Sequence, residues 1–84
     1  MTNLTLFIDA GKYTTARELH LALKMMLQLP EHYGCNADAL HDCLSERRDA
    51  VNLVLFSEGE GEVAEALRKC IKVVEDLDGN IVRL

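Results

Sequence analysis

Three short apolar runs in the sequence predict three β-strands. Residues 4–8 and 51–56 are almost continuous in Leu, Ile, Val and Phe, a pattern typical of strands that are covered on both faces of a sheet. A third and shorter run lies at residues 81–84. The first two runs end at Asp9-Ala10-Gly11 and at Ser57, where small or polar residues allow a strand to stop.

Between the first two strands, apolar residues recur with the period of an α-helix and predict two helices. The first covers residues 15–28, because Thr15 and Glu18 have the spacing of a capping box and Pro30 forbids continuation. The second begins after Asn36, a residue that caps helices well, and runs to about Ser45. Its apolar and polar positions separate cleanly onto two faces.

A third helix is predicted between the second and third strands. Ser57 and Glu60 have a second capping-box spacing, and the helix should end near Leu77. Its apolar stripe consists of Val63, Ala66, Leu67, Cys70, Ile71 and Val74. Strands that are separated by helices, with no hairpin turn between them, pair in parallel through right-handed crossovers. The predicted fold class is therefore α/β, a small three-stranded parallel sheet packed with helices, in a single domain of residues 1–84.

Composition and charge narrow the class of partner. The 84 residues are 49% hydrophobic and 27% charged, so the chain can form one compact core and does not have the composition of a disordered protein. Fourteen acidic against nine basic residues give a net charge of −5. A surface of that sign repels phosphate backbones, which argues against nucleic acid and favours a basic protein as the partner. We expect the free protein to be a monomer.

The cysteines and the first residues suggest a compartment. Cys35, Cys43 and Cys70 are odd in number and cannot form a closed set of disulfides, which favours a reducing interior. The apolar run at residues 4–8 is too short for a signal sequence and has no Lys or Arg before it. No segment approaches the length that spans a bilayer. We therefore expect a cytoplasmic protein with no membrane partner.

One stretch of the chain carries negative charge only. Residues 25–46 contain no Lys or Arg but include Glu31, Asp38, Asp42 and Glu46. Asp38 lies in the first helical turn, where the helix dipole stabilises an anion by about 0.3–1 kcal/mol. Asp42 lies one turn later on the same face, where like charges repel by about 0.2–0.5 kcal/mol. Either this face is simply solvated, or its carboxylates serve a partner.

The loop before this helix favours a binding surface. Residues 29–36 include His32, Tyr33 and Gly34, and we expect a positive φ at the glycine. His41 lies on the same helix face as the two aspartates. Amphipathic rings beside carboxylates are typical of an interface that receives an Arg- or His-rich target.

The residues of this loop and helix resemble a known signature. Residues 29–44 read LPEHYGCNADALHDCL, and this stretch resembles the pattern LP-x-YYG-x-N-x-DAL-x-DCL of the barstar family, intracellular inhibitors of secreted barnase-type ribonucleases. The shared residues fall at the same spacing. A weaker similarity extends to Leu19-His20 and to the order strand, two helices, strand, helix, strand.

The resemblance implies an inhibitor that plugs the active site of a ribonuclease. In the family, the Asp at the position of Asp42 accepts hydrogen bonds from the Arg and His side chains that otherwise hold the scissile phosphate. Asp38 corresponds to a second interface acid. His32 corresponds to an aromatic residue that stacks on a catalytic His, and Gly34 and Asn36 to the loop whose backbone meets the enzyme. The partner implied is a barnase-type ribonuclease.

The chain also departs from the family pattern. His32 stands where the family usually has Tyr, His41 stands where it often has Trp, and Cys35 replaces a residue that is acidic in the inhibitor after which the family is named. The two histidines reduce the contact area relative to Tyr and Trp. The target can therefore be another small nuclease. The alternative function is an interaction or regulatory module of the same fold for another basic protein.

The end of the third helix offers a second group of acids. Glu75 and Asp76 lie where the helix dipole disfavours negative charge, so we predict one of them at the edge of the interface. The same helix carries Arg68, Lys69 and Lys72, which have the arrangement of a solvated face. We assign no function to these basic residues.

Two other kinds of site are weaker. His32, Cys35 and His41 could converge on a metal, but their spacing matches no standard zinc motif. No nucleophile motif, phosphate-binding glycine loop or cofactor fingerprint is present, so we expect neither an enzyme nor a cofactor. His20 faces the core side of its helix and is expected to be structural.

Overall fold

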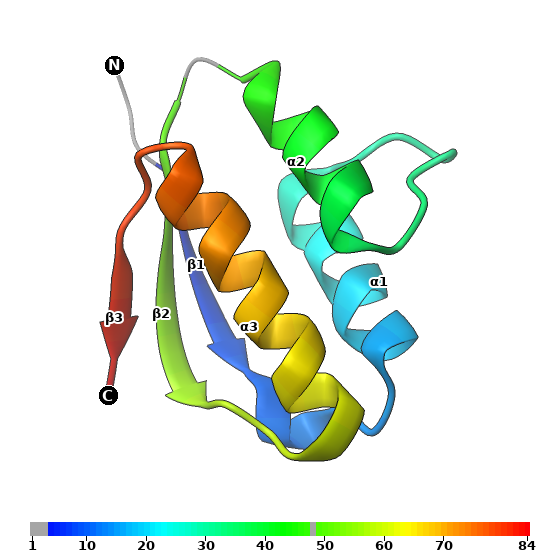
Figure 1. Ribbon diagram of the computed structural model, residues 1–84, viewed down its shortest axis with the longest axis vertical. Helices are drawn as coiled ribbons and strands as arrows, with labels where there is room; N and C mark the ends of the chain where they lie inside the picture. Colours follow the sequence, from blue (N-terminus) through cyan, green and yellow to red (C-terminus); the bar gives the residue numbers. More distant parts are fainter. Residues whose placement is uncertain (1–3, 48) are drawn as a thin grey trace.

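The sheet holds the predicted strands side by side. The structure is a computed structural model that describes residues 4–47 and 49–84. Strands β1 (Leu4–Asp9), β2 (Val51–Ser57) and β3 (Ile81–Arg83) lie in the order β1-β2-β3, and both pairings are parallel (Figure 1). The predicted α/β class and the parallel sheet are confirmed.

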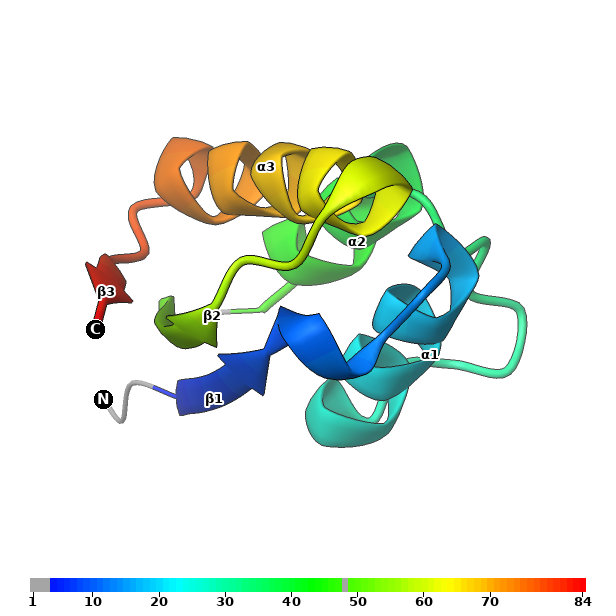
Figure 2. The same ribbon diagram turned by 90° about the horizontal axis from the view of Figure 1, so that it is seen from below.

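Three α-helices form the second layer. Helix α1 (Ala16–Leu27) and helix α2 (Ala37–Ser45) connect β1 to β2, and helix α3 (Gly61–Asp76) connects β2 to β3. A short 3-10 turn at Ala10–Lys12 follows β1 and was not predicted. Figure 2 shows the helices gathered on one side of the sheet, and α3 packs against both α1 and α2. The fold therefore has two layers.

The sheet is covered on one face only, and the prediction that both faces are covered is wrong. Leu6 and Ile8 of β1 point to the helices and are buried. On the opposite face Phe7, Phe56 and Val82 are 60%, 55% and 47% exposed. The rings of Phe7 and Phe56 stack with their centroids 6.1 Å apart. Both faces of these strands carry apolar residues, so the sequence did not show the alternation that usually marks a half-exposed strand.

The starts of two helices differ in how they are capped. In α1 the predicted capping box is formed, because Thr15 Oγ1 accepts from the Glu18 backbone N–H at 3.1 Å and Glu18 Oε1 accepts from the Thr15 N–H at 3.0 Å. Hydrogen bonds from Thr14 and Thr15 lower the pKa of the Glu18 carboxyl. The second predicted box is not formed. Ser57 ends β2, and Glu60 caps α3 without a side-chain hydrogen bond.

The core lies between the helices and the inner face of the sheet. Helix α2, which carries the candidate site, contributes Leu40 and Leu44 to it. The three cysteines are all free. Cys70 is buried, which raises the pKa of its thiol to about 12, and partial burial also raises the pKa of Cys43. Both pack as small apolar side chains, as expected.

Candidate protein-binding site

Helix α2 presents its polar face to solvent on a fixed base. Leu40 and Leu44 are buried on one side of the helix, so the opposite side must face outward. Asp38, His41 and Asp42 are all exposed there. The predicted separation of α2 into an apolar and a polar face is confirmed.

The two ends of α2 are stabilised in different ways. At its start, Asn36 Oδ1 accepts a hydrogen bond from the Ala39 backbone N–H at 2.8 Å, which makes Asn36 the N-cap. Just beyond its end, Arg47 Nη1 donates to the carbonyl oxygen of Leu27 in α1 at 3.3 Å. The first contact caps the helix locally, and the second ties the end of α2 to α1.

The loop before α2 is anchored by a buried side-chain pair. Tyr33 is 7% exposed and His20 of α1 is 3% exposed, and the Tyr33 hydroxyl is hydrogen-bonded to His20 Nδ1 at 2.7 Å. Burial lowers the pKa of His20 and raises the pKa of Tyr33. The expectation that His20 is structural is confirmed. The Tyr33 ring lies in the core. Tyr33 was predicted as a site residue, and its position allows it to hold the loop in place from the inner side.

The last residues of the loop set the entry into α2. The positive φ predicted for Gly34 is wrong, because the left-handed residue of this turn is Cys35, with a φ of 53°. A Cβ at Gly34 would lie 3.3 Å from Asn36 Nδ2 and 3.4 Å from the Ala39 Cβ. Asn36 Nδ2 also donates to the Gly34 carbonyl oxygen at 3.2 Å. Gly34 is therefore suited to this turn by its small size, and Asn36 by both of its amide atoms.

The tip of the loop is exposed. His32 is exposed, and the adjacent Glu31 pairs with Lys24 of α1 across 3.4 Å. Figure 1 shows the loop projecting beyond α1 and α2. His32 thus lies at the outer edge of the surface that also carries Asp38 and Asp42.

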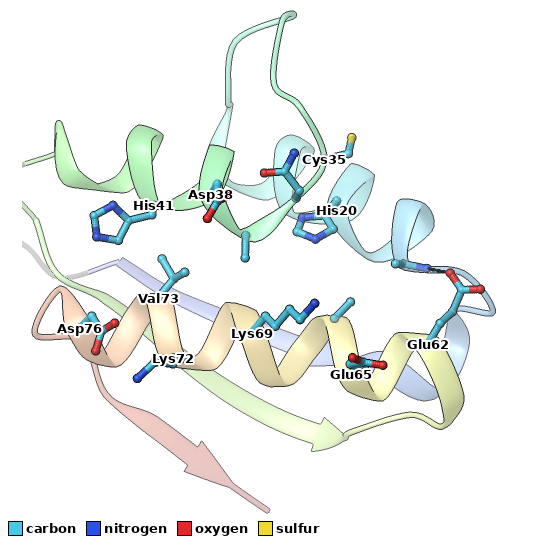
Figure 3. A pocket seen from close by; sticks show the side chains of 14 residues that line it. His20, Cys35, Asp38, His41, Glu62, Glu65, Lys69, Lys72, Val73 and Asp76 are labelled. Carbon is cyan, nitrogen blue, oxygen red and sulfur yellow. Dashed lines mark hydrogen bonds between the residues drawn. The ribbon is translucent and has the colours of Figure 1, made fainter.

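A groove runs between α2 and α3 beside this surface, with a volume of about 740 Å³ (Figure 3). Asp38 and His41 line it from α2, and Lys69, Lys72 and Asp76 line it from α3. Its remaining lining residues are Ala16, His20, Cys35, Asn36, Ala37, Glu62, Glu65, Ala66 and Val73. Of the two acids predicted near the end of the third helix, Asp76 lines the groove and Glu75 does not.

The two lysines were not assigned a function from the sequence. Lys69 and Lys72 lie in a row with Glu65 and Asp76 at helical spacing, beside the buried stripe of α3. This row of polar residues in the sequence could have identified the two lysines as candidate site residues. What the row faces, however, depends on how α2 packs against α3, and this packing is a tertiary property.

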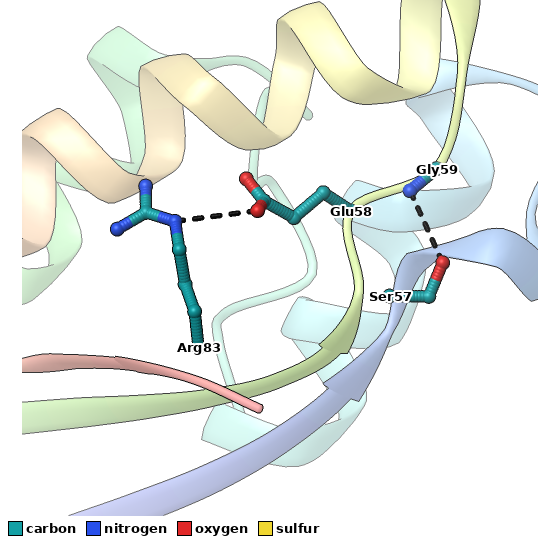
Figure 4. A network of polar contacts seen from close by, with 4 residues as sticks. All are labelled: Ser57, Glu58, Gly59 and Arg83. Carbon is teal, nitrogen blue, oxygen red and sulfur yellow. Dashed lines mark hydrogen bonds and ion pairs between the residues drawn. The ribbon is translucent and has the colours of Figure 1, made fainter.

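Ion pairs are few where the structure describes the chain. The two pairs among residues 4–47 and 49–84 join Lys24 to Glu31 and Arg83 to Glu58, the latter at 3.3 Å (Figure 4). Neither involves Asp42. The Asp42 carbonyl oxygen, and not its carboxylate, accepts a hydrogen bond from Ser45 Oγ at 2.9 Å. Within the described residues, the Asp42 carboxylate therefore has no internal cation.

Within residues 4–47 and 49–84, no three His, Cys, Asp or Glu side chains are placed to hold a metal ion together, so His32, Cys35 and His41 do not converge. Across the same ranges, every helix is too short or too polar to cross a bilayer.

The fold and this surface define a class: small two-layer α/β proteins that present an acidic helix and its preceding loop to solvent. The chain belongs to the barstar family, because the family model Barstar (barnase inhibitor) matches residues 3–80. The match covers nearly the whole chain. This is a family of inhibitors that bind barnase-type ribonucleases, and it is not a family of enzymes.

Proposed function

We propose that the chain binds a small barnase-type ribonuclease and occludes its active site, with Asp42 as the central contact. The observation that carries the proposal is the exposed Asp42 carboxylate, which stands on a well-anchored helix without an internal cation among the described residues. An exposed carboxylate on a rigid base can accept hydrogen bonds from cationic groups that otherwise bind a substrate phosphate.

The residues around Asp42 complete the proposed contact. Asp38 and His41 flank it on α2 and are exposed. His32 offers an exposed ring at the loop tip that can stack on a ring of the nuclease. Gly34 and Asn36 present the loop backbone, and Tyr33 supports that backbone from the core. Asp76 lies at the edge of the contact and Glu75 outside the groove.

The net charge of the chain supports recognition of a basic protein. The chain carries −5, and the proposed face carries two aspartates, so a basic nuclease is attracted over long distances before contact. The three free thiols support a reducing, cytoplasmic location, which is part of the same proposal.

The test is inhibition of a purified barnase-type ribonuclease. We expect activity to be abolished near a one-to-one ratio. Asp42→Asn removes the charge with little change of shape and should weaken inhibition by at least about 30-fold, which corresponds to the lower end of the cost of unpairing a buried interfacial charge. Glu60→Ala is the control, because Glu60 is exposed at the start of α3 and makes no side-chain cap hydrogen bond.

The outcomes separate the two functions considered. Equal inhibition by the Asp42 and Glu60 variants would reject the proposed site. No inhibition of the nuclease, together with Asp42-dependent binding of a different basic protein, would support the interaction module.

A further inference from the structure

The groove between α2 and α3 has walls of different charge. Asp38 lies on the α2 wall, and Lys69 and Lys72 lie on the α3 wall. Figure 3 shows Lys69 extended along its helix with its ammonium group on the side of His20, while Asp38 comes from the opposite helix. The protein therefore offers a partner an acidic α2 wall beside an α3 wall on which two lysines lie among acids.

The two lysines are not neutralised by the described part of the chain. Both are exposed, and among residues 4–47 and 49–84 neither takes part in an ion pair or a side-chain hydrogen bond. Glu65 precedes Lys69 by four residues, a favourable spacing for a helical pair, but the two do not form an ion pair within 4.0 Å. Their charges are available to a partner.

A wholly basic partner fits this groove poorly. If it docks on Asp42, it also brings cations towards Lys69 and Lys72, and like charges that face each other across an interface weaken binding. Covering the ammonium groups without providing acceptors adds a desolvation cost. A partner with a carboxylate at this place avoids both costs.

A small free anion is also a poor occupant. Glu62 and Glu65 line one end of the groove and Asp76 the other, so negative groups lie on both sides of the lysines. Ala66 and Val73 add apolar lining between them. A groove with alternating charges and an apolar floor is better matched by a protein segment with side chains of both signs.

We infer that the partner carries an Asp or Glu next to its basic cleft and that Lys69 and Lys72 bind this carboxylate while α2 binds the cations. This inference rests on the proposed function, since it assumes docking through Asp42. It identifies α3 as a specificity determinant: nucleases that lack the carboxylate are bound more weakly.

Charge reversal of single lysines tests the inference, because the direction of the change in affinity distinguishes the two kinds of partner. The dissociation constant for the inhibited ribonuclease is measured for Lys69→Glu and Lys72→Glu, with Arg68→Glu as the matched control. Arg68 is exposed on the same helix, undergoes the same change of charge and does not line the groove. We expect each lysine variant to bind at least about fivefold more weakly and the control to change by less than about twofold.

A wholly basic partner predicts the opposite sign, because each Lys→Glu change makes the inhibitor more acidic. Tighter or unchanged binding of both lysine variants would overturn the inference. Lys69→Gln and Lys72→Gln should also weaken binding, by less, and they provide the same test if a reversed charge disturbs folding. Circular dichroism spectra of all variants verify the fold.

Zero-length carbodiimide cross-linking of the complex provides an independent measurement. Mass spectrometry should find Lys69 or Lys72 joined to an Asp or Glu of the ribonuclease, with no such link from Lys12, which lies outside the groove. Links from Lys12 alone would contradict the inference. If Asp42→Asn leaves binding unchanged, the proposed function itself fails; if Asp42→Asn weakens binding and the lysine variants do not, only the inference fails.

Discussion

His20 Nδ1 and the Tyr33 hydroxyl oxygen lie 2.7 Å apart in the core beneath the loop that leads to α2. The rings are tilted by 50°, with centroids separated by 5.9 Å. This contact joins the inner side of α1 to a loop whose outer side belongs to the proposed interface. The stability of the fold and the position of the binding loop are therefore coupled through one buried polar pair.

Protonation of His20 should destabilise the protein below neutral pH. Burial lowers the pKa of His20 below its ordinary value of 6.5. As the pH falls, His20 therefore binds a proton in the unfolded chain at a higher pH than in the folded chain. The free energy of unfolding should fall as the pH decreases through about 6.5 towards the lowered pKa. Urea unfolding between about pH 5 and 8 measures this, and His20→Asn, which keeps a hydrogen-bonding nitrogen, should flatten the dependence. The control His41→Gln, at an exposed position, should retain it; an unchanged slope in His20→Asn would contradict the prediction.

Gly79 should tolerate no side chain. A Cβ there would overlap the Val51 carbonyl oxygen and the Val74 side chain, so Gly79→Ala must displace backbone or core and should cost more than about 2 kcal/mol. Gly61 has a φ of 60° but open space around it, so Gly61→Ala should cost only the left-handed strain of about 1–2 kcal/mol. Chemical unfolding of both variants ranks the two costs, and a smaller loss at Gly79 would show that the turn relaxes.

Loss of the α2 cap should weaken both stability and binding. Asn36→Ala removes the acceptor for the Ala39 N–H and should lower the free energy of unfolding by about 0.5–2 kcal/mol. Asn36→Asp keeps a capping oxygen and should lose less. The prediction is checked by unfolding curves and by inhibition titrations of the same variants. Equal stability of Asn36→Ala and the unmodified chain would mean that the cap is replaced by solvent.

Association with the ribonuclease should slow as salt rises. Attraction between the acidic inhibitor and a basic nuclease acts over distances that salt screens, so the association rate constant should fall about tenfold or more between about 50 and 500 mM NaCl. Stopped-flow measurements give this rate directly. Asp42→Asn should reduce the salt dependence. An association rate that does not respond to salt would instead indicate an apolar interface.

Local signals in the sequence predicted most elements correctly. The Thr15–Glu18 capping box, the Asn36 cap and Pro30 define helix ends through contacts within a few residues, and α1 and α2 are found where these signals place them. The parallel pairing also follows from the order of elements, because each crossover contains a helix. The Ser57–Glu60 spacing misled because a glycine with positive φ at position 59 turns the chain before α3, and Gly61, the first residue of the helix, also has a positive φ.

The candidate site divides in the same way. The sequence by itself determined that α2 exposes Asp38 and Asp42, because a helix with one apolar side must present the other side to water. Only the tertiary structure decided that Tyr33 lies in the core, that one face of the sheet remains open and that Lys69 and Lys72 line a groove beside the acidic helix. These properties depend on which surfaces of separate elements meet. These contacts join residues that are far apart in the chain, and no local sequence pattern encodes them.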